Sequence, residues 1–160
     1  YSMTGWRIGY AGGPDDLIKA RAKIQSQSTT NPSSISQAAA VEALNGDQSF
    51  ITERTIAFKS RRDFVVTSLN KVQGISCLNP QGAFYIFPSC KDCIGKKHKD
   101  LGKINNDTDF VTKLLEKTGV AVVQGSAFGL EGFFRISYAT SMENLEKAVK
   151  RISEFCSDLS

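Results

Sequence analysis

Two arginines occupy positions where a charged side chain is difficult to accommodate alone. Arg7 follows Trp6 and Arg135 follows Phe134, and each lies in a short apolar segment that is predicted to be a strand. A guanidinium group keeps its charge, so burial among apolar neighbours is costly unless an anion binds it. Carboxylates and phosphates match its fork of N–H donors. One such arginine is commonly part of a structural ion pair, whereas two beside glycine-containing loops favour a site for two anionic groups.

Cys90 and Cys93 form a C-x-x-C pair, and the sequence has four cysteines in total. A zinc site would need further ligands at a regular spacing, and beyond His98 no fourth ligand follows. A redox pair would be expected to open a helix, but Pro88 and Gly95 lie close to this pair instead. The pattern favours free thiols in a cytoplasmic protein and predicts no metal site.

Turn residues and hydrophobic spacing define the elements that would position these side chains. The first part of the sequence predicts a strand over residues 6–11, a helix that begins at Asp15, a second helix from Ser33 or Ser34 to Asn45-Gly46, and a long helix over about residues 48–72. Residues 25–30 are predicted to be an irregular polar stretch between the first two helices.

The second part of the sequence predicts a small α+β layer after the long helix. Its expected elements are strands over residues 75–78, 83–87, 120–123 and 133–139, a helix capped by Asp107 or Thr108 and closed by Gly119, and a last helix capped by Ser141. Residues 89–106 are expected to form a long polar loop.

Four segments, in order, are similar to class I aminotransferases of the bacterial and plant-type aspartate aminotransferase subgroup. They are YSMTGWRIGYAGG from Tyr1, NPQGAFYIFP from Asn79, VAVVQGSAFG from Val120 and FFRISYATS from Phe133. The resemblance covers nearly the whole chain. It implies an α/β fold, namely the C-terminal part of a fold-type I pyridoxal-phosphate-dependent transferase. Residues 1–47 would be the tail of the large domain, and residues 48–160 the interdomain helix and the small α+β domain.

The resemblance also implies roles for individual residues. Arg7 resembles the arginine that pairs with the phosphate of pyridoxal 5'-phosphate, and Arg135 resembles the arginine that binds the substrate α-carboxylate. Phe84 resembles an aromatic residue of the substrate pocket, although ordinary core packing would also explain it. Thr30 and Asn31 resemble a loop that reaches the neighbouring subunit of a homodimer, although an ordinary turn would also explain them.

In that family the lysine that carries the cofactor lies eight residues before the phosphate-binding arginine. That position is two residues before Tyr1, so no catalytic residue is expected in this chain, which alone should be inactive. A sequence that begins so close to a predicted strand is also expected to be a fragment.

The resemblance implies that the parent enzyme transfers the amino group of aspartate to 2-oxoglutarate. Two departures from the family pattern stand out. Residues 24–30 contain no arginine, whereas animal-type enzymes use one there for the second substrate carboxylate, and Gln124 replaces a common proline, which we expect to change loop stiffness. The alternatives are an aromatic, alanine or prephenate aminotransferase, or a non-catalytic ligand-binding or assembly module.

Composition excludes several other classes of protein. Among the 160 residues, 41% are hydrophobic and 22% are charged, as in ordinary globular proteins. No apolar run approaches the roughly 20 residues that span a bilayer, and no secretory signal is visible. The net charge of +4 is dispersed, and the basic cluster at residues 96–99 contains no aromatic side chain. We therefore expect a cytoplasmic protein that binds amino acids and 2-oxo acids, but neither nucleic acid nor membrane.

Overall fold

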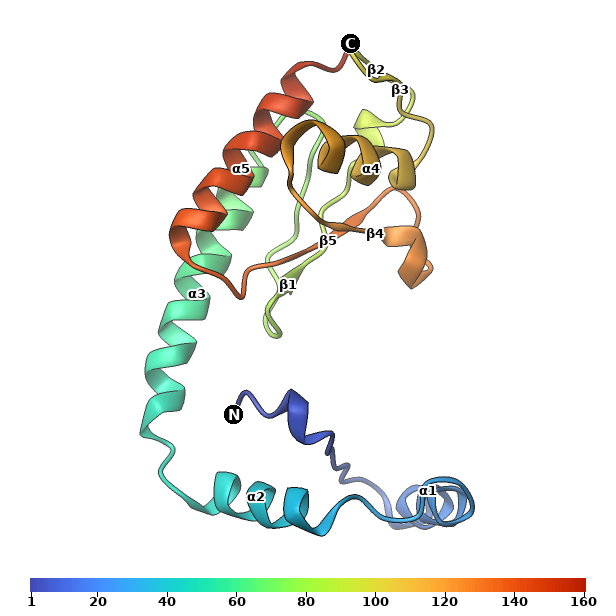
Figure 1. The fold of residues 1–160 in the computed structure, drawn as a ribbon, viewed down its shortest axis with the longest axis vertical. Helices are drawn as coiled ribbons and strands as arrows, with labels where there is room; N and C mark the ends of the chain where they lie inside the picture. The colour runs from blue at the N-terminus through green and yellow to red at the C-terminus, as the bar shows by residue number, and fades with distance from the viewer. The chain divides into compact units, whose positions relative to one another are not determined.

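The computed structural model describes residues 1–160, and the chain divides into two compact units, Tyr1–Thr52 and Glu53–Ser160 (Figure 1). The helix α3 (Ser49–Leu69) begins in the first unit and continues into the second. None of the helices combines the length and the apolar character that crossing a bilayer demands.

The first unit is helical and contains no strand. Its elements are η1 (Thr4–Trp6), α1 (Asp15–Ser28), α2 (Ser34–Asn45) and the first turn of α3. The predicted strand over residues 6–11 is wrong, because a strand needs a partner for its backbone groups and no segment of the chain pairs with these residues. The predicted polar stretch at residues 25–30 is also wrong, since α1 continues to Ser28.

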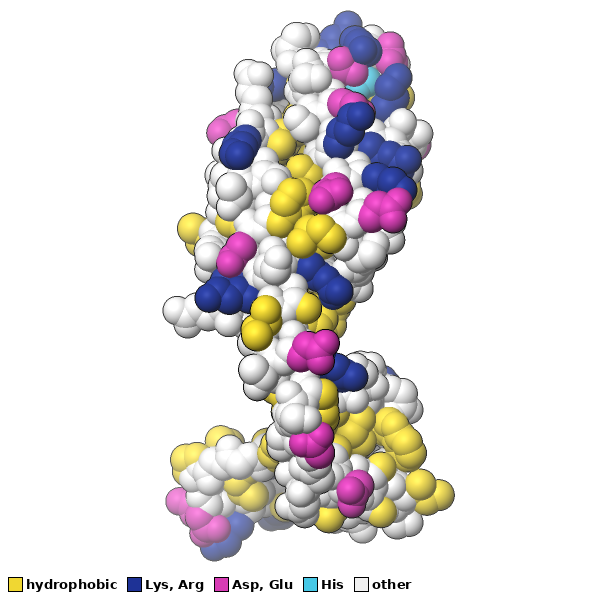
Figure 2. All heavy atoms as spheres, turned by 90° about the vertical axis from the view of Figure 1, so that its left-hand side faces the viewer, with side chains coloured by type: hydrophobic (Ala, Val, Ile, Leu, Met, Phe, Trp, Pro, Cys, Tyr) yellow, Lys and Arg dark blue, Asp and Glu magenta, His cyan; other side chains and the backbone are white.

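Apolar side chains of the first unit remain at its surface. Its one buried residue is Ser36, whose hydroxyl donates a hydrogen bond to the Trp6 carbonyl over 2.8 Å. Leu17, Ile24 and Ile35 are all more than 60% exposed, and Figure 2 shows apolar atoms on the surface of this unit. The unit therefore has no hydrophobic core of its own.

The second unit is an antiparallel three-stranded sheet covered on one face by helices. The strand order is β1 (Tyr85–Ile86), β5 (Phe134–Ser137), β4 (Val123–Gln124), and the covering helices include α4 (Asp107–Thr118) and α5 (Met142–Ser157) (Figure 1). The core includes Leu69, Ile86, Phe110, Phe134, Ile152 and Phe155, which come from both the strands and the helices.

The strands are shorter than the sequence predicted. Of residues 75–78 only Ser76 forms a bridge, to Ser89, and the strands predicted over residues 83–87, 120–123 and 133–139 reduce to β1, β4 and β5. Val120 is buried but belongs to no strand. A hydrophobic pattern reports burial, whereas a strand also requires a hydrogen-bonded neighbour.

Helix ends follow local capping interactions. Ser141 caps α5 as predicted, because its hydroxyl accepts the backbone N–H of Asn144, and Gly119 closes α4 in a left-handed conformation. The cap of α4 is one residue earlier than predicted, at Asn106, whose side chain accepts the N–H of Asp109. The long helix ends at Leu69, and the side chain of Asn70 then donates to the carbonyl of Cys77 and accepts its N–H.

The segment predicted as a long polar loop contains regular structure. It includes η2 (Lys91–Cys93) and the hairpin of β2 (Lys97–His98) with β3 (Gly102–Lys103). His98 is fully buried and stacks on Phe155 with ring centroids 5.0 Å apart. A histidine inside a lysine-rich run gave no sequence signal of burial, since only the fold brings Phe155 to it.

One glycine of the second unit leaves no space for a side chain. A Cβ at Gly125, which begins η3 (Gly125–Phe128), would lie 2.2 Å from the Leu130 carbonyl oxygen. We predict that Gly125→Ala lowers the free energy of unfolding by about 1–3 kcal/mol, the usual cost of overpacking. Urea unfolding followed by circular dichroism measures this. Gly82→Ala is the matched control, because a Cβ there meets nothing within 4 Å; equal stability of the two variants would contradict the prediction.

Candidate functional site

Arg135 projects from the face of the sheet opposite to the core. Its neighbours Phe134 and Ile136 are buried in the core, and side chains alternate along a strand. In the antiparallel register Tyr85 lies opposite Ser137, two residues from Arg135, so their side chains share one face. The strand pairing therefore places a charged group beside an aromatic one.

The Arg135 guanidinium lies over two aromatic rings. Its Cζ atom is 4.3 Å from the centroid of Tyr85 and 4.5 Å from that of Phe128. No carboxylate pairs with it, and its N–H groups make no hydrogen bond within the chain. Cation–π attraction stabilises the charge without using the N–H donors. The group is therefore able to bind an anion in fork fashion.

Two further phenylalanines extend this surface. Phe87 packs edge-on against Phe128 with centroids 5.9 Å apart, and it stacks on Phe133 at 5.8 Å. Lys91 places its ammonium 4.9 Å from the centroid of Phe133. We call the rings of Tyr85, Phe87, Phe128 and Phe133 the aromatic face. This face combines apolar area with cationic groups, a composition suited to a small organic anion.

Phe84, which was predicted from the sequence as a site residue, contacts Tyr85 and makes no ring contact with Arg135 itself. Its ring is 41% exposed and contacts Tyr85, with centroids 4.4 Å apart, and Phe58, at 6.5 Å. It is therefore not a fully buried core residue. Sequence reasoning missed Tyr85 and Phe128, the rings that do contact Arg135. Tyr85 could have been found from the strand register, whereas Phe128 could not, because a 3-10 turn places it.

The turn that carries Phe128 is anchored to α4. The carboxylate of Asp107, only 2% exposed, accepts the backbone N–H of Ser126 over 2.7 Å. The N–H of Gly129 closes the turn on the carbonyls of Gly125 and Ser126. Asp107 was predicted as a possible helix cap, but its side chain instead holds this turn in place.

Gln124 ends β4 directly before this turn. Its φ of −60° is close to the value that proline fixes, so glutamine adopts the backbone conformation that a proline would impose. The replacement therefore requires no different path of the chain at this point.

Arg7 is exposed and lies in a left-handed conformation, not in a strand, with φ of 51°. Its Nη1 donates a hydrogen bond to the Thr4 carbonyl over 3.1 Å, and no acidic side chain pairs with it. A guanidinium with this single neutral partner has donors left for a phosphate, so the residue fits the predicted ligand chemically.

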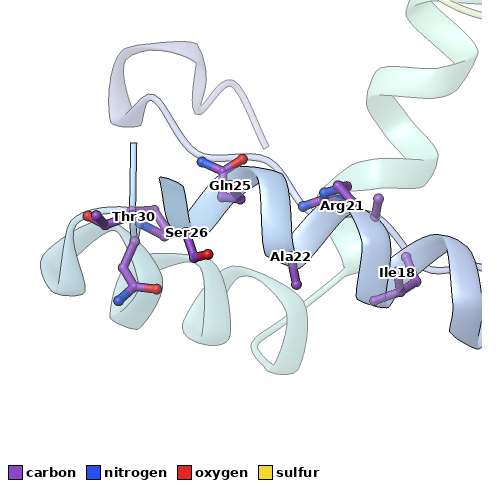
Figure 3. Close-up of a pocket in the computed structure, with 9 residues that line it drawn as sticks. Ile18, Arg21, Ala22, Gln25, Ser26 and Thr30 are labelled. Atoms are coloured by element: carbon purple, nitrogen blue, oxygen red, sulfur yellow. The ribbon is translucent and has the colours of Figure 1, made fainter. Parts of the chain in front are cut away.

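Thr30 and Asn31 line a pocket of about 310 Å³ in the first unit. Figure 3 shows Thr30 near Ser26 at the end of α1, and Arg21 and Gln25 from earlier in this helix line the same pocket. Arg21 is the one charged residue of this lining. The sequence has no arginine at residues 24–30, and the fold brings one from an earlier turn of the helix. Thr30 has a φ of 63°, in the left-handed region that non-glycine residues adopt uncommonly.

The predicted site residues fall into two groups, one in each unit of the chain. Arg135 and Phe84 belong to the second unit and are linked through Tyr85. Thr30 and Asn31 share one pocket of the first unit, and Arg7 belongs to the same unit but does not line that pocket.

The four cysteines are buried free thiols, and no cluster of three or more histidine, cysteine or acidic side chains is arranged to hold a metal ion. Burial raises the pKa of Cys90 to about 12 and that of Cys77 to about 11. A hydrogen bond between Cys93 and Cys156 lowers the pKa of Cys93 and raises that of Cys156. Cys90 and Cys93 are both fully buried and belong to the hydrophobic core.

We predict that the Cys90 thiol reacts slowly while the chain is folded. At pH 8 a thiol with a pKa near 12 is ionised in only about one molecule in ten thousand, and the thiolate is the reactive form. Labelling with Ellman's reagent should be at least about a hundredfold slower for Cys90 in the folded protein than in guanidinium chloride, and should accelerate as pH rises. Rapid labelling of Cys90 at pH 8 under native conditions would refute this.

A family model described as "Aminotransferase class I and II" matches residues 1–152. Among curated proteins, an aspartate aminotransferase of Rhizobium meliloti is 58% identical over 160 residues, which are 100% of this chain and 39% of that protein. A probable aspartate/prephenate aminotransferase of Rhizobium leguminosarum bv. phaseoli is 60% identical over 98% of this chain and 39% of its own length. The chain thus spans about 40% of the length of the curated relatives that it matches.

Solved structures agree with these relatives. The crystal structure of the aspartate aminotransferase from Rhizobium meliloti matches with a TM-score of 0.88 and 58% identity, over 100% of this chain and 40% of that one. An alanine aminotransferase from Pyrococcus furiosus matches with a TM-score of 0.80 and 34% identity, over 97% of this chain and 39% of that one.

Proposed function

This chain belongs to the class I and II aminotransferase family, and from that membership we propose that it is part of an aspartate aminotransferase. The predicted fold class is confirmed, since the structural relatives are fold-type I aminotransferases. The family implies pyridoxal phosphate as the cofactor. The proposed reaction transfers the amino group of aspartate to 2-oxoglutarate, and the relatives that are called aspartate aminotransferases support it.

The proposed domain assignment follows the predicted one. Residues 1–47 would be the tail of the large domain, and residues 48–160 the interdomain helix with the small α+β domain. A division of the chain within α3, between Thr52 and Glu53, supports a domain boundary near the start of this helix. The exposed apolar side chains of the first unit also support its being a portion of a larger domain.

Arg7 is the residue of this chain that would hold the cofactor. When bound, the pyridoxal ring supplies an electron sink for the carbanion that forms at the substrate Cα. The unpaired guanidinium of Arg7 would bind the cofactor phosphate by charge-assisted hydrogen bonds and so fix one end of the cofactor. No residue of this chain is proposed to transfer a proton or to attach the cofactor.

Arg135 would bind the substrate α-carboxylate and orient the Cα–H bond for reaction. The observation that carries this proposal is the guanidinium over Tyr85 and Phe128 with its N–H donors unused. Phe84, which is exposed and packs against Tyr85, would line the substrate side of the pocket.

Further proposals concern assembly and location. We propose that the parent protein is a cytoplasmic homodimer in which Thr30 and Asn31 approach the neighbouring subunit. Their pocket, with Arg21 as its single charge, supports contact with a polar or anionic group.

Prephenate is a second candidate substrate, because relatives at 56–60% identity are described as aspartate/prephenate aminotransferases. Aspartate and prephenate each carry two carboxylates. A panel of aspartate, alanine, aromatic amino acids and prephenate, tested on the full-length protein, separates these possibilities. Activity with alanine or aromatic substrates alone would reject the proposed function.

We predict that Arg135→Ala in the full-length protein raises KM for aspartate and weakens transition-state binding by about 2–5 kcal/mol, because a desolvated carboxylate loses its partner. Steady-state kinetics measure the change in kcat/KM. Arg151→Ala is the matched control, since Arg151 lines a different pocket with Lys117 and Glu154. Wild-type kinetics for Arg135→Ala would remove this residue from the site.

We predict that Arg7→Ala weakens binding of pyridoxal phosphate to the full-length protein by about 10- to 100-fold, the usual value of a hydrogen bond to a charged group. Absorbance titration of the cofactor-free protein gives the dissociation constant. Lys19→Ala removes a charge from the same unit but only breaks a surface pair with Asp15, so it serves as the control. Equal affinities for the two variants would argue against phosphate binding by Arg7.

A further inference from the structure

The surroundings of Arg135 differ from those of an ordinary structural arginine. In this chain Arg62 has an acidic partner, Asp63, at 2.7 Å and donates to the Pro80 carbonyl at 2.9 Å. Arg135 has neither kind of partner, and its Cζ atom instead lies within 4.5 Å of two ring centroids. The rings of Tyr85 and Phe128 stabilise the positive charge of Arg135, and its N–H donors remain free of hydrogen bonds.

The two rings come from separate elements, and each is supported independently. Tyr85 lies in β1, which pairs directly with the strand of Arg135, and its ring packs against Phe84. Phe128 ends η3, where Phe87 packs against it and the anchor from Asp107 holds the turn. Tyr85 and Phe128 make no ring contact with one another, so Arg135 is the group that connects them.

This arrangement addresses two difficulties of carboxylate recognition by arginine. A long side chain loses rotamer freedom when it binds, which weakens binding unless the chain is ordered beforehand. An acidic neighbour would order it but would occupy the N–H donors and neutralise the charge. Aromatic rings restrict the guanidinium through their π faces and leave the donors free.

We propose that Tyr85 and Phe128 are positioning residues that hold the Arg135 guanidinium ready for a substrate carboxylate. The inference rests on the proposed function of Arg135 and adds to it two residues that do not themselves bind the carboxylate. The aromatic ring is the required feature, and the Tyr85 hydroxyl is not, because the contact with Arg135 is made by the ring.

The test uses Tyr85→Leu and Phe128→Leu in the full-length, cofactor-loaded protein. Each variant should raise the dissociation constant of maleate, a dicarboxylate without a transferable amino group, and KM for aspartate by about three- to tenfold, the range that one cation–π contact allows. The value of kcat should change less than about twofold. Tyr85→Phe and Phe128→Tyr keep the rings and should restore wild-type binding.

A double-mutant cycle separates positioning from general structural damage. In the Arg135→Ala background the leucine substitutions should have no further effect on maleate binding. Phe64→Leu is the control, because it changes a partly buried ring of α3 that contacts neither Arg135 nor the aromatic face. This variant should bind maleate as the wild type does, even where its melting temperature is similar to those of the Tyr85→Leu and Phe128→Leu variants. If Tyr85→Phe binds as weakly as Tyr85→Leu, or if the leucine effects persist without Arg135, the inference is overturned. Should Arg135→Ala itself bind maleate normally, the proposed function of Arg135 fails first.

Discussion

The pairing of β5 between β1 and β4 is the constraint on which the second unit depends. Because side chains alternate along β5, the same four residues supply Phe134 and Ile136 to the core and Arg135 to the opposite face. A register shift of one residue would bury the guanidinium and expose a phenylalanine, so core formation and site formation are one event. The stability of this sheet therefore determines where the charge lies.

The positive charge of Arg135 is stabilised without an acidic partner, and in this respect the site differs from a structural ion pair. Two rings reach Arg135 from a neighbouring strand and from a turn that Asp107 anchors to α4. The strand pairing of Tyr85 and the buried Asp107 anchor of the turn are parts of the folded second unit, so the positions of the two rings depend on that fold.

The first unit shows that a strand-like sequence pattern forms a strand only where another segment pairs with it. Residues around Arg7 have strand-like composition, but no neighbouring strand pairs with them and they form an irregular path after η1. Exposed Leu17 and Ile24 similarly have no core to enter. Local helix signals, such as the acidic first turn of α1, still operate because they need only nearby residues.

The sequence by itself determined the family resemblance, the two arginines, the cap at Ser141 and the helix end at Gly119, because each depends on residues adjacent in the chain. It also indicated a small mixed layer of strands and helices after the long helix, whereas the strand that it predicted over residues 6–11 does not form. Tertiary structure decided which apolar segments pair as strands, the burial of His98, and the contacts of Arg135 with Tyr85 and Phe128. It also brought Arg21 into the lining of the same pocket as Thr30 and Asn31. These features depend on which distant segments meet, and a hydrophobic pattern records that a residue is buried without recording its neighbour.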